Sequence, residues 1–176
     1  MGLDKPSELA ASARVARQLR LITASLYSAE ADKKWEAVRA LGELAARPDL
    51  LDDGRLRELL RRYFWSLNSE SGAVPFGLPE AIGEALAQRP ALQPEFLPLL
   101  CSLAYQGEMS QTGAILCGVI WALGRVGSAV AGCDPDAVTA LRNLAANAPE
   151  TQARQLARWA LEQIEKGGQA TCGQAG

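Results

Sequence analysis

Three short stretches recur along the chain: Ala40-Leu41-Gly42-Glu43, Ala81-Ile82-Gly83-Glu84 and Ala122-Leu123-Gly124-Arg125. Their glycines stand at positions 42, 83 and 124, so each interval is 41 residues. A fourth copy without the glycine, Ala160-Leu161-Glu162-Gln163, begins 38 residues after the third. A period near 40 residues is typical of stacked helix pairs. The small residues let neighbouring helices approach closely, and the Leu or Ile fills the space between them.

Amphipathic spacing predicts one helix before each copy and one helix through it. The first helices of the pairs are predicted over residues 7–27, 55–67, 94–105 and 134–147. The second helices are predicted over 30–46, 78–88, 110–127 and 150–166. The sequence therefore predicts an all-α fold, a short α-α superhelix of about four helix pairs and eight helices. Residues 1–166 are expected to form one domain, and 167–176 a flexible C-terminal tail.

Composition supports helices and excludes several other classes. Apolar residues make up 48% of the 176 residues and aromatic residues only 6%, a bias towards Ala and Leu that favours helices over strands. No apolar stretch approaches the ~18–20 residues that span a bilayer, so no membrane association is expected. The start of the chain lacks a basic segment followed by an apolar block, which predicts no signal peptide and a cytoplasmic location.

The titratable residues exclude most catalytic chemistry. The chain has no histidine, which removes Ser-His-Asp and Cys-His catalysis and His-ligated metals. Its four cysteines form no CxxC motif, and two of them, Cys101 and Cys117, fall inside apolar helical patterns and are interpreted as core thiols. We therefore predict no catalytic residue, no metal site and no cofactor. The net charge of -2 lacks the basic excess of nucleic-acid binders, which predicts no nucleic-acid partner. The basic patch over 55–62 is interpreted as a solvated helix face.

Two rows of side chains are expected on the face formed by the second helices, the usual ligand face of such repeats. The first row is Arg39, Glu80, Trp121 and Trp159, and the second is Glu43, Glu84, Arg125 and Gln163. Adjacent helices lie ~8–10 Å apart, so Arg39 should reach Glu80, and Glu84 should reach Arg125. The rows can be a ladder of partly exposed ion pairs, each contributing ~0–1 kcal/mol, or a groove in which Trp121 and Trp159 anchor a partner.

One segment breaks the repeat pattern. Residues 69–77 lack helical periodicity and contain two glycines and a proline. The polar residues Asn68, Glu70 and Ser71 stand there beside Trp65 and Phe76. The segment can be a turn whose polar groups cap helix ends, or a recognition loop. We predict a recognition site formed by this loop with four residues of the second helices, Glu80, Glu84, Trp121 and Arg125.

The repeat resembles the HEAT-like repeats of the phycobilisome-lyase type, in which a basic residue, small residues and Ala-Leu-Gly share one helix. Lys34, Ala37, Val38 and Ala40-Leu41-Gly42 match in the first copy, and Arg154, Ala157 and Ala160-Leu161 match in the fourth. The second and third copies have Pro75 and Leu116 where the basic residue belongs. The Trp65–Glu84 region is also similar to a run found in uncharacterised bacterial HEAT-repeat proteins.

This resemblance implies a solenoid but leaves several functions open, because such repeats serve scaffolds, lyases, chaperones and DNA-repair proteins. The leading hypothesis is a non-enzymatic scaffold that binds a protein or peptide on its concave face. A prosthetic-group lyase or cofactor chaperone is an alternative. A HEAT-like glycosylase that excises alkylated bases is another, although it requires a basic track that the sequence lacks overall.

Overall fold

The computed structural model describes residues 5–68, 75–106 and 113–172, and within them it contains nine α-helices and no strand. The helices are α1 (Lys5–Ser25), α2 (Ala31–Ala45), α3 (Asp53–Leu67), α4 (Leu78–Gln88), α5 (Gln93–Ser102), α6 (Gly113–Val126), α7 (Ala129–Cys133), α8 (Pro135–Asn147) and α9 (Thr151–Cys172). A 3₁₀ turn, η1 (Pro90–Leu92), precedes α5. The predicted all-α class is confirmed.

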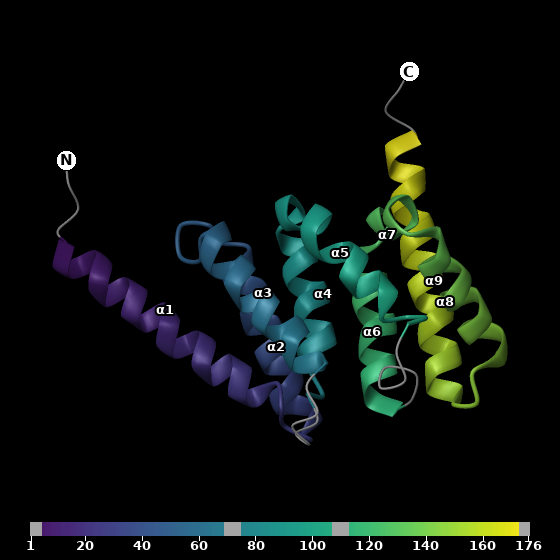
Figure 1. Ribbon diagram of the computed structural model, residues 1–176, viewed down its shortest axis with the longest axis horizontal. Coiled ribbons are helices and arrows are strands. Elements are labelled where there is room, and N and C mark those ends of the chain that lie inside the picture. The colour runs from purple at the N-terminus through teal and green to yellow at the C-terminus, as the bar shows by residue number, and fades with distance from the viewer. Residues whose placement is uncertain (1–4, 69–74, 107–112, 173–176) are drawn as a thin grey trace.

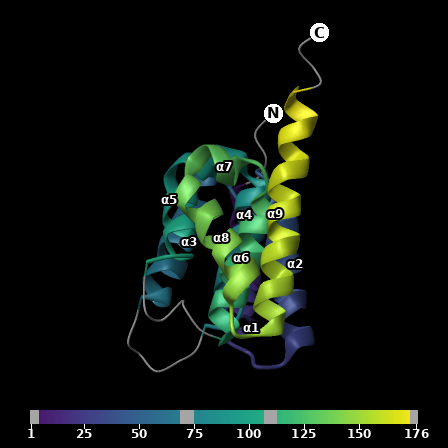
Figure 2. The ribbon, with the colours of Figure 1, turned by 90° about the vertical axis from the view of Figure 1, so that its right-hand side faces the viewer.

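The helices form two rows (Figure 1). In one row α2, α4, α6 and α9 pack side by side in that order, and these are the helices that carry the repeated Ala-Leu-Gly stretches. Figure 2 looks along this row and shows α3 and α5 together on one side of it. Each of α1, α3, α5 and α8 contacts the next helix of the row, so the predicted pairing of first and second helices is present.

The repeat glycines lie where the helices of the row approach most closely. A Cβ atom on Gly83 would stand 2.5 Å from Cα of Ala122 on the next helix. One on Gly124 would stand 2.9 Å from Cα of Ala160. Both helix pairs therefore pack backbone against backbone, and any side chain at these two glycines would force the helices apart.

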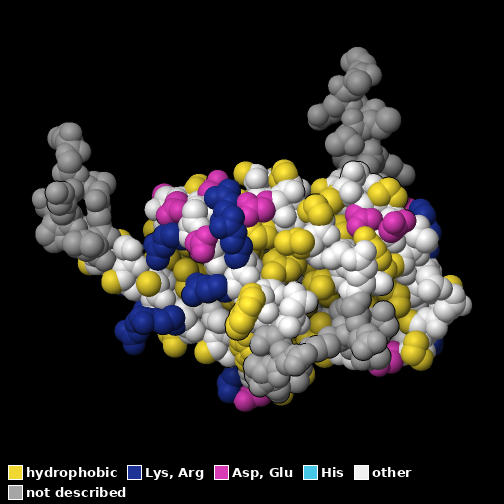
Figure 3. Space-filling model, in the orientation of Figure 1, with side chains coloured by type: hydrophobic (Ala, Val, Ile, Leu, Met, Phe, Trp, Pro, Cys, Tyr) yellow, Lys and Arg dark blue, Asp and Glu magenta, His cyan; other side chains and the backbone are white. Residues whose placement is uncertain are grey.

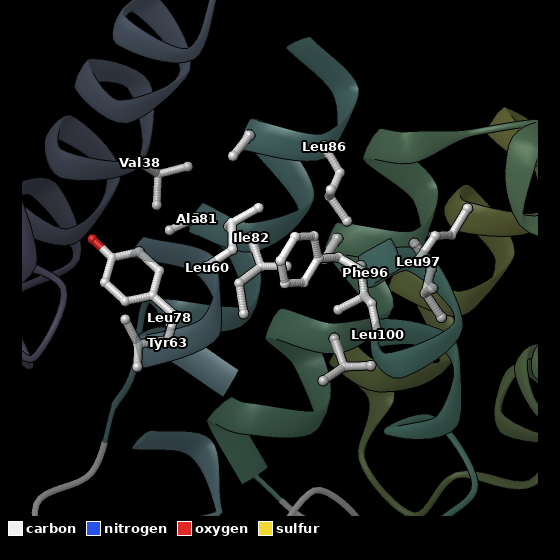
Figure 4. Packing of buried hydrophobic residues seen from close by; sticks show 14 of the residues in the cluster. Val38, Leu60, Tyr63, Leu78, Ala81, Ile82, Leu86, Phe96, Leu97 and Leu100 are labelled. Atoms are coloured by element: carbon white, nitrogen blue, oxygen red, sulfur yellow. The ribbon is translucent and has the colours of Figure 1, made fainter. Parts of the chain in front are cut away.

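The core lies between the two rows, and Figure 4 shows side chains of α2, α3, α4 and α5 converging in it. Ile82 of α4 and Leu100 of α5 are fully buried there. Phe96 of α5 stacks on Phe64 of α3, with 6.0 Å between the ring centroids and 8° between the planes. This contact joins neighbouring first helices, since the 3.6-residue period turns both rings inwards.

A buried arginine fastens the second repeat to the first. Arg89 follows α4 and donates hydrogen bonds to the backbone carbonyls of Ala45 (Nε, 3.0 Å) and Leu51 (Nη2, 3.0 Å). Its guanidinium also pairs with the carboxylate of Asp53 in the first turn of α3. The side chain of Arg89 thus satisfies carbonyl groups at the end of α2 and in the following turn, which would otherwise be buried without donors.

Two differences from the predicted helices concern the C-terminal third. The short helix α7 was not predicted, because its five residues are too few to show a helical period and follow Gly127, whose φ is +77°. Helix α9 runs to Cys172, past the predicted end at residue 166. Residues 110–112 of the third predicted second helix lie outside the described part of the chain.

None of the helices in the described ranges combines the length and the apolar character needed to cross a membrane.

Candidate binding groove

Three tryptophans lie together on the outer face of the row. Trp35 of α2 meets Trp121 of α6 edge to face, with 4.9 Å between ring centroids and 67° between the planes. Trp159 of α9 stacks on Trp121, with 6.4 Å between centroids and 16° between the planes. All three rings pack against the core on one side and remain partly exposed on the other. They form an aromatic array across three helices of the row.

A groove opens beside the first two of these rings. Its volume is about 340 Å³. Because α4 packs between α2 and α6, and Trp35 and Trp121 touch each other, the two rings meet over α4. We call this space the α4 groove. Its lining consists of Trp35, Val38, Arg39, Gly42, Glu43, Ala46, Glu84, Gln88 and Trp121. It therefore combines an aromatic end, charged walls and small residues.

Glu84 lies in the α4 groove and is held in a fixed orientation. Arg125 donates two hydrogen bonds to its carboxylate, Nε to Oε2 at 2.6 Å and Nη2 to Oε1 at 3.0 Å, and Gln88 donates a third at 3.0 Å. Burial acts to raise the pKa of Glu84, but the hydrogen bonds from Arg125 and Gln88 outweigh it and hold that pKa below its ordinary value. Gly42 makes room for this carboxylate, since a Cβ there would stand 2.7 Å from Glu84 Cγ. The predicted ion pair between Glu84 and Arg125 is confirmed.

Glu80 has a different environment from the predicted one. Its side chain is buried, with only 2% of the residue exposed, and its Oε1 accepts a hydrogen bond from Nζ of Lys34 at 2.7 Å. The predicted pairing of Glu80 with Arg39 is wrong: Lys34 reaches it from one turn earlier on α2. The same ammonium lies 4.9 Å from the ring centroid of Trp35. Lys34 therefore links the buried carboxylate to the aromatic array.

The second oxygen of Glu80 has no hydrogen-bond donor among the described residues. It packs against Gly118 of α6, where a Cβ atom would stand 2.5 Å from Oε2. Burial is the main cause that raises the pKa of Glu80, and Lys34 offsets only part of it. Glu80 and Glu84 thus stand one turn apart with pKa values displaced in opposite directions.

The predicted recognition residues separate into two groups. Glu84, Trp121 and Arg125 come together at the α4 groove, with Trp159 stacked alongside. Trp65 lies on α3 in the other row, 73% exposed, and does not line the groove.

The pattern-breaking segment is described only at its ends. Asn68 is exposed and caps the end of α3 by donating to the carbonyl of Phe64 at 3.0 Å. Phe76 is partly buried just before α4, where Gly77 N–H donates to the carbonyl of Leu26 at 2.8 Å. Glu70 and Ser71 lie outside the described residues.

Trp35 is the site residue that the sequence analysis missed. It stands four residues before Arg39, so it shares the outer face of α2 with a residue that was placed there correctly. The spacing was available as a signal. The contact with Trp121 could not be predicted from the sequence. Equivalent repeat positions predict contacts between neighbouring helices, and α2 and α6 are separated by α4.

The chemical groups around the α4 groove include a thiol and several charged side chains. The nearby thiol of Cys117 has its pKa raised by burial, which keeps it protonated. Among the described residues no cluster of three or more Cys, Asp or Glu side chains could hold a metal ion. The groove thus presents an aromatic surface beside carboxylate and guanidinium groups of fixed orientation.

No family model, curated protein or solved structure matches this chain.

Proposed function

We propose that the protein is a non-enzymatic scaffold that binds a segment of a partner protein in the α4 groove, on the face of a short HEAT-like superhelix. One observation carries this proposal: three tryptophans on three helices form a continuous, partly exposed array that ends at a groove of about 340 Å³. Tryptophan, with tyrosine and arginine, is among the residue types most enriched at the energetic centres of protein interfaces.

The charges around the array support recognition of a peptide. Arg39 and Glu43 stand one turn apart on α2, both exposed, and have no ion-pair partner in the described residues. Glu84 is already neutralised by Arg125. The groove therefore presents one positive and one negative side chain for a partner, together with apolar area from Trp35 and Trp121. Such a surface suits a segment with an apolar anchor and polar flanks.

The test uses peptides selected on the full chain from a random display library. We expect Trp121→Ala to weaken the selected peptide about 30-fold, as loss of a central aromatic anchor costs ~2 kcal/mol or more. Arg39→Glu, an exposed change on the groove wall, should also weaken it without altering the melting temperature. The matched control is Trp65→Ala, which removes an exposed tryptophan from the other row and should leave affinity unchanged.

Two results would overturn the proposal. One is failure to select any peptide that competes at the groove. The other is a selected peptide whose affinity depends on Trp65 and is indifferent to Arg39 and Trp121.

A further inference from the structure

Helices α1 and α3 diverge and leave a second groove between them. Figure 1 shows α1 leaning away from the rest of the molecule. The space between the two helices has a volume of about 690 Å³. We call it the α1–α3 groove. It shares no lining residue with the α4 groove, and its lining is Ala16, Leu19, Arg20, Thr23, Gly54, Arg55, Glu58, Leu59, Arg62, Tyr63 and Ser66.

The two helices that flank this groove are strongly basic in an otherwise acidic chain. Together α1 and α3 hold eight of the 18 Lys and Arg but three of the 20 Asp and Glu. They carry a net charge of +5, whereas the whole chain carries -2. Figure 3 shows the Lys and Arg side chains gathered over this end of the molecule. Positive charge is thus concentrated on the two helices that flank the groove, and three of these arginines line it together with Glu58.

Two of the three arginines that line the groove, Arg20 and Arg62, are exposed, whereas Arg55 is partly buried and donates to Oγ of Ser12 at 3.5 Å. Arg57 and Arg61, on the side of α3 turned towards α5, bind Glu95 at 2.7 and 2.8 Å. By contrast, no carboxylate in the described ranges lies within ion-pair distance of Arg20, Arg55 or Arg62. Arg20 and Arg62 are exposed on opposite walls. The groove therefore has a guanidinium group on each side.

The groove floor is apolar with a polar end. Leu19 of α1 and Leu59 of α3 contribute side chains that belong to the core, and Ala16 adds a small apolar surface. At one end the hydroxyl groups of Thr23 and Tyr63 lie 2.9 Å apart in a hydrogen bond that joins the two helices. An occupant would thus meet apolar side chains along its inner face and a guanidinium group on each edge, beside Glu58, whose carboxylate is paired with Arg61.

We propose that the α1–α3 groove is a second binding site, which takes an acidic amphipathic helix of a partner protein. A helix with apolar residues on one face fits a groove between two diverging helices, and carboxylates on its flanks complement Arg20 and Arg62. Nucleic acid fits less well. The only aromatic ring in the lining, Tyr63, is buried and offers no surface for base stacking, and the chain as a whole is negative.

The test measures fluorescence anisotropy of a labelled synthetic helix of about 18 residues, with leucines on one face and glutamates on the other. We expect saturable binding to the full chain. Arg20→Glu and Arg62→Glu should each weaken it about tenfold, since each replaces an attraction by a repulsion. Arg142→Glu, an exposed reversal on α8, serves as the matched control and should weaken it much less. Circular dichroism of each variant checks that the helices persist.

Three results would overturn this proposal. One is a glutamine-for-leucine version of the helix that binds equally well, because the apolar floor would then contribute nothing. Another is a duplex oligonucleotide that binds more tightly and with the same dependence on Arg20 and Arg62. The third is equal weakening by Arg142→Glu, which would show a general charge effect. All of them are independent of Trp121, so failure here leaves the proposal for the α4 groove standing.

Discussion

The rings of Trp35 and Trp121 touch, with centroids 4.9 Å apart, although the helices that carry them are separated by α4. Glu80, the residue of α4 in the same row as Arg39 and Trp121, is buried and accepts a hydrogen bond from Lys34. The ammonium of Lys34 also lies 4.9 Å from the centroid of the Trp35 ring. The aromatic array and the buried ion pair are therefore parts of one arrangement.

Two glycine substitutions should have opposite effects on stability, because only one of the two glycines lies at a close contact between helices. Gly83→Ala should destabilise the protein by ~1–3 kcal/mol, because the new Cβ would stand 2.5 Å from backbone and side-chain carbon of Ala122. Gly132→Ala in α7 should be neutral or stabilising by up to ~1 kcal/mol, since no atom lies within 4 Å of its Cβ position and alanine favours helix. Urea denaturation of both variants checks this. Equal stability of the two would contradict the observed helix contact.

Two adjacent lysines should differ sharply in their contribution to stability. Lys34→Met removes the partner of buried Glu80, and loss of one member of a buried pair costs ~3–5 kcal/mol. Lys33→Met removes an exposed pair with Glu30 and should cost ~0–1 kcal/mol. Thermal and urea unfolding at neutral pH measure both. A Lys34→Met protein as stable as the Lys33→Met protein would show that Glu80 is not buried as described.

The two glutamates of α4 should affect the pH dependence of stability in opposite directions. Glu80 has a pKa raised above 4.5 in the folded protein, so its carboxyl favours folding when protonated. The free energy of unfolding of the wild type, relative to that of Glu80→Gln, should fall as the pH rises above about 4.5. The fall should continue until the pH exceeds the pKa of Glu80 in the folded protein.

Glu84 has a pKa lowered below 4.5, so its contribution is fully present above that value. The difference between wild type and Glu84→Gln should shrink as the pH falls below about 4.5, through the folded pKa. Urea titrations at a series of pH values give both curves. Two differences that change in the same direction with pH would contradict the environments described for Glu80 and Glu84.

Arg89 should be irreplaceable by lysine. Its planar guanidinium serves the carbonyls of Ala45 and Leu51 at once, and an ammonium cannot match that geometry. Arg89→Lys should cost ~1–3 kcal/mol, because a buried carbonyl loses its donor. Arg47→Lys, at an exposed pair with Asp49, is the control and should change the unfolding free energy by less than ~1 kcal/mol. If both variants have the same free energy of unfolding, the hydrogen bonds of Arg89 contribute no stability to the contact between the first and second repeats.

The sequence predicts those parts of the structure that depend on repeat register. Gly83 and Gly124 lie at the helix contacts that their spacing implies, and the pair of Glu84 with Arg125 follows from their equivalent positions on adjacent helices. Register locates backbones and near neighbours, because these are set by the helical period and the distance between helices.

Register does not predict where long side chains reach. Lys34 extends from one turn away to a carboxylate on the next helix, and Trp35 extends across α4 to α6. These contacts depend on which rotamers leave room for each other, and on the absence of a Cβ at Gly118, where Oε2 of Glu80 packs. The shape of the α4 groove depends on these rotamers, which is why Trp35, one of its lining residues, was identified only in the structure.

The most direct measurement of the proposed function is the set of tryptophan indole N–H resonances of the full chain, titrated with a display-selected peptide. The chain has four tryptophans, and each signal is assigned by its loss in a Trp→Phe variant. We predict that the signals of Trp35 and Trp121 shift as the peptide binds, while that of Trp65 on the opposite row stays in place. A shift of the Trp65 signal with the Trp35 and Trp121 signals unmoved would contradict the proposed function, because the partner would then bind the other side of the molecule.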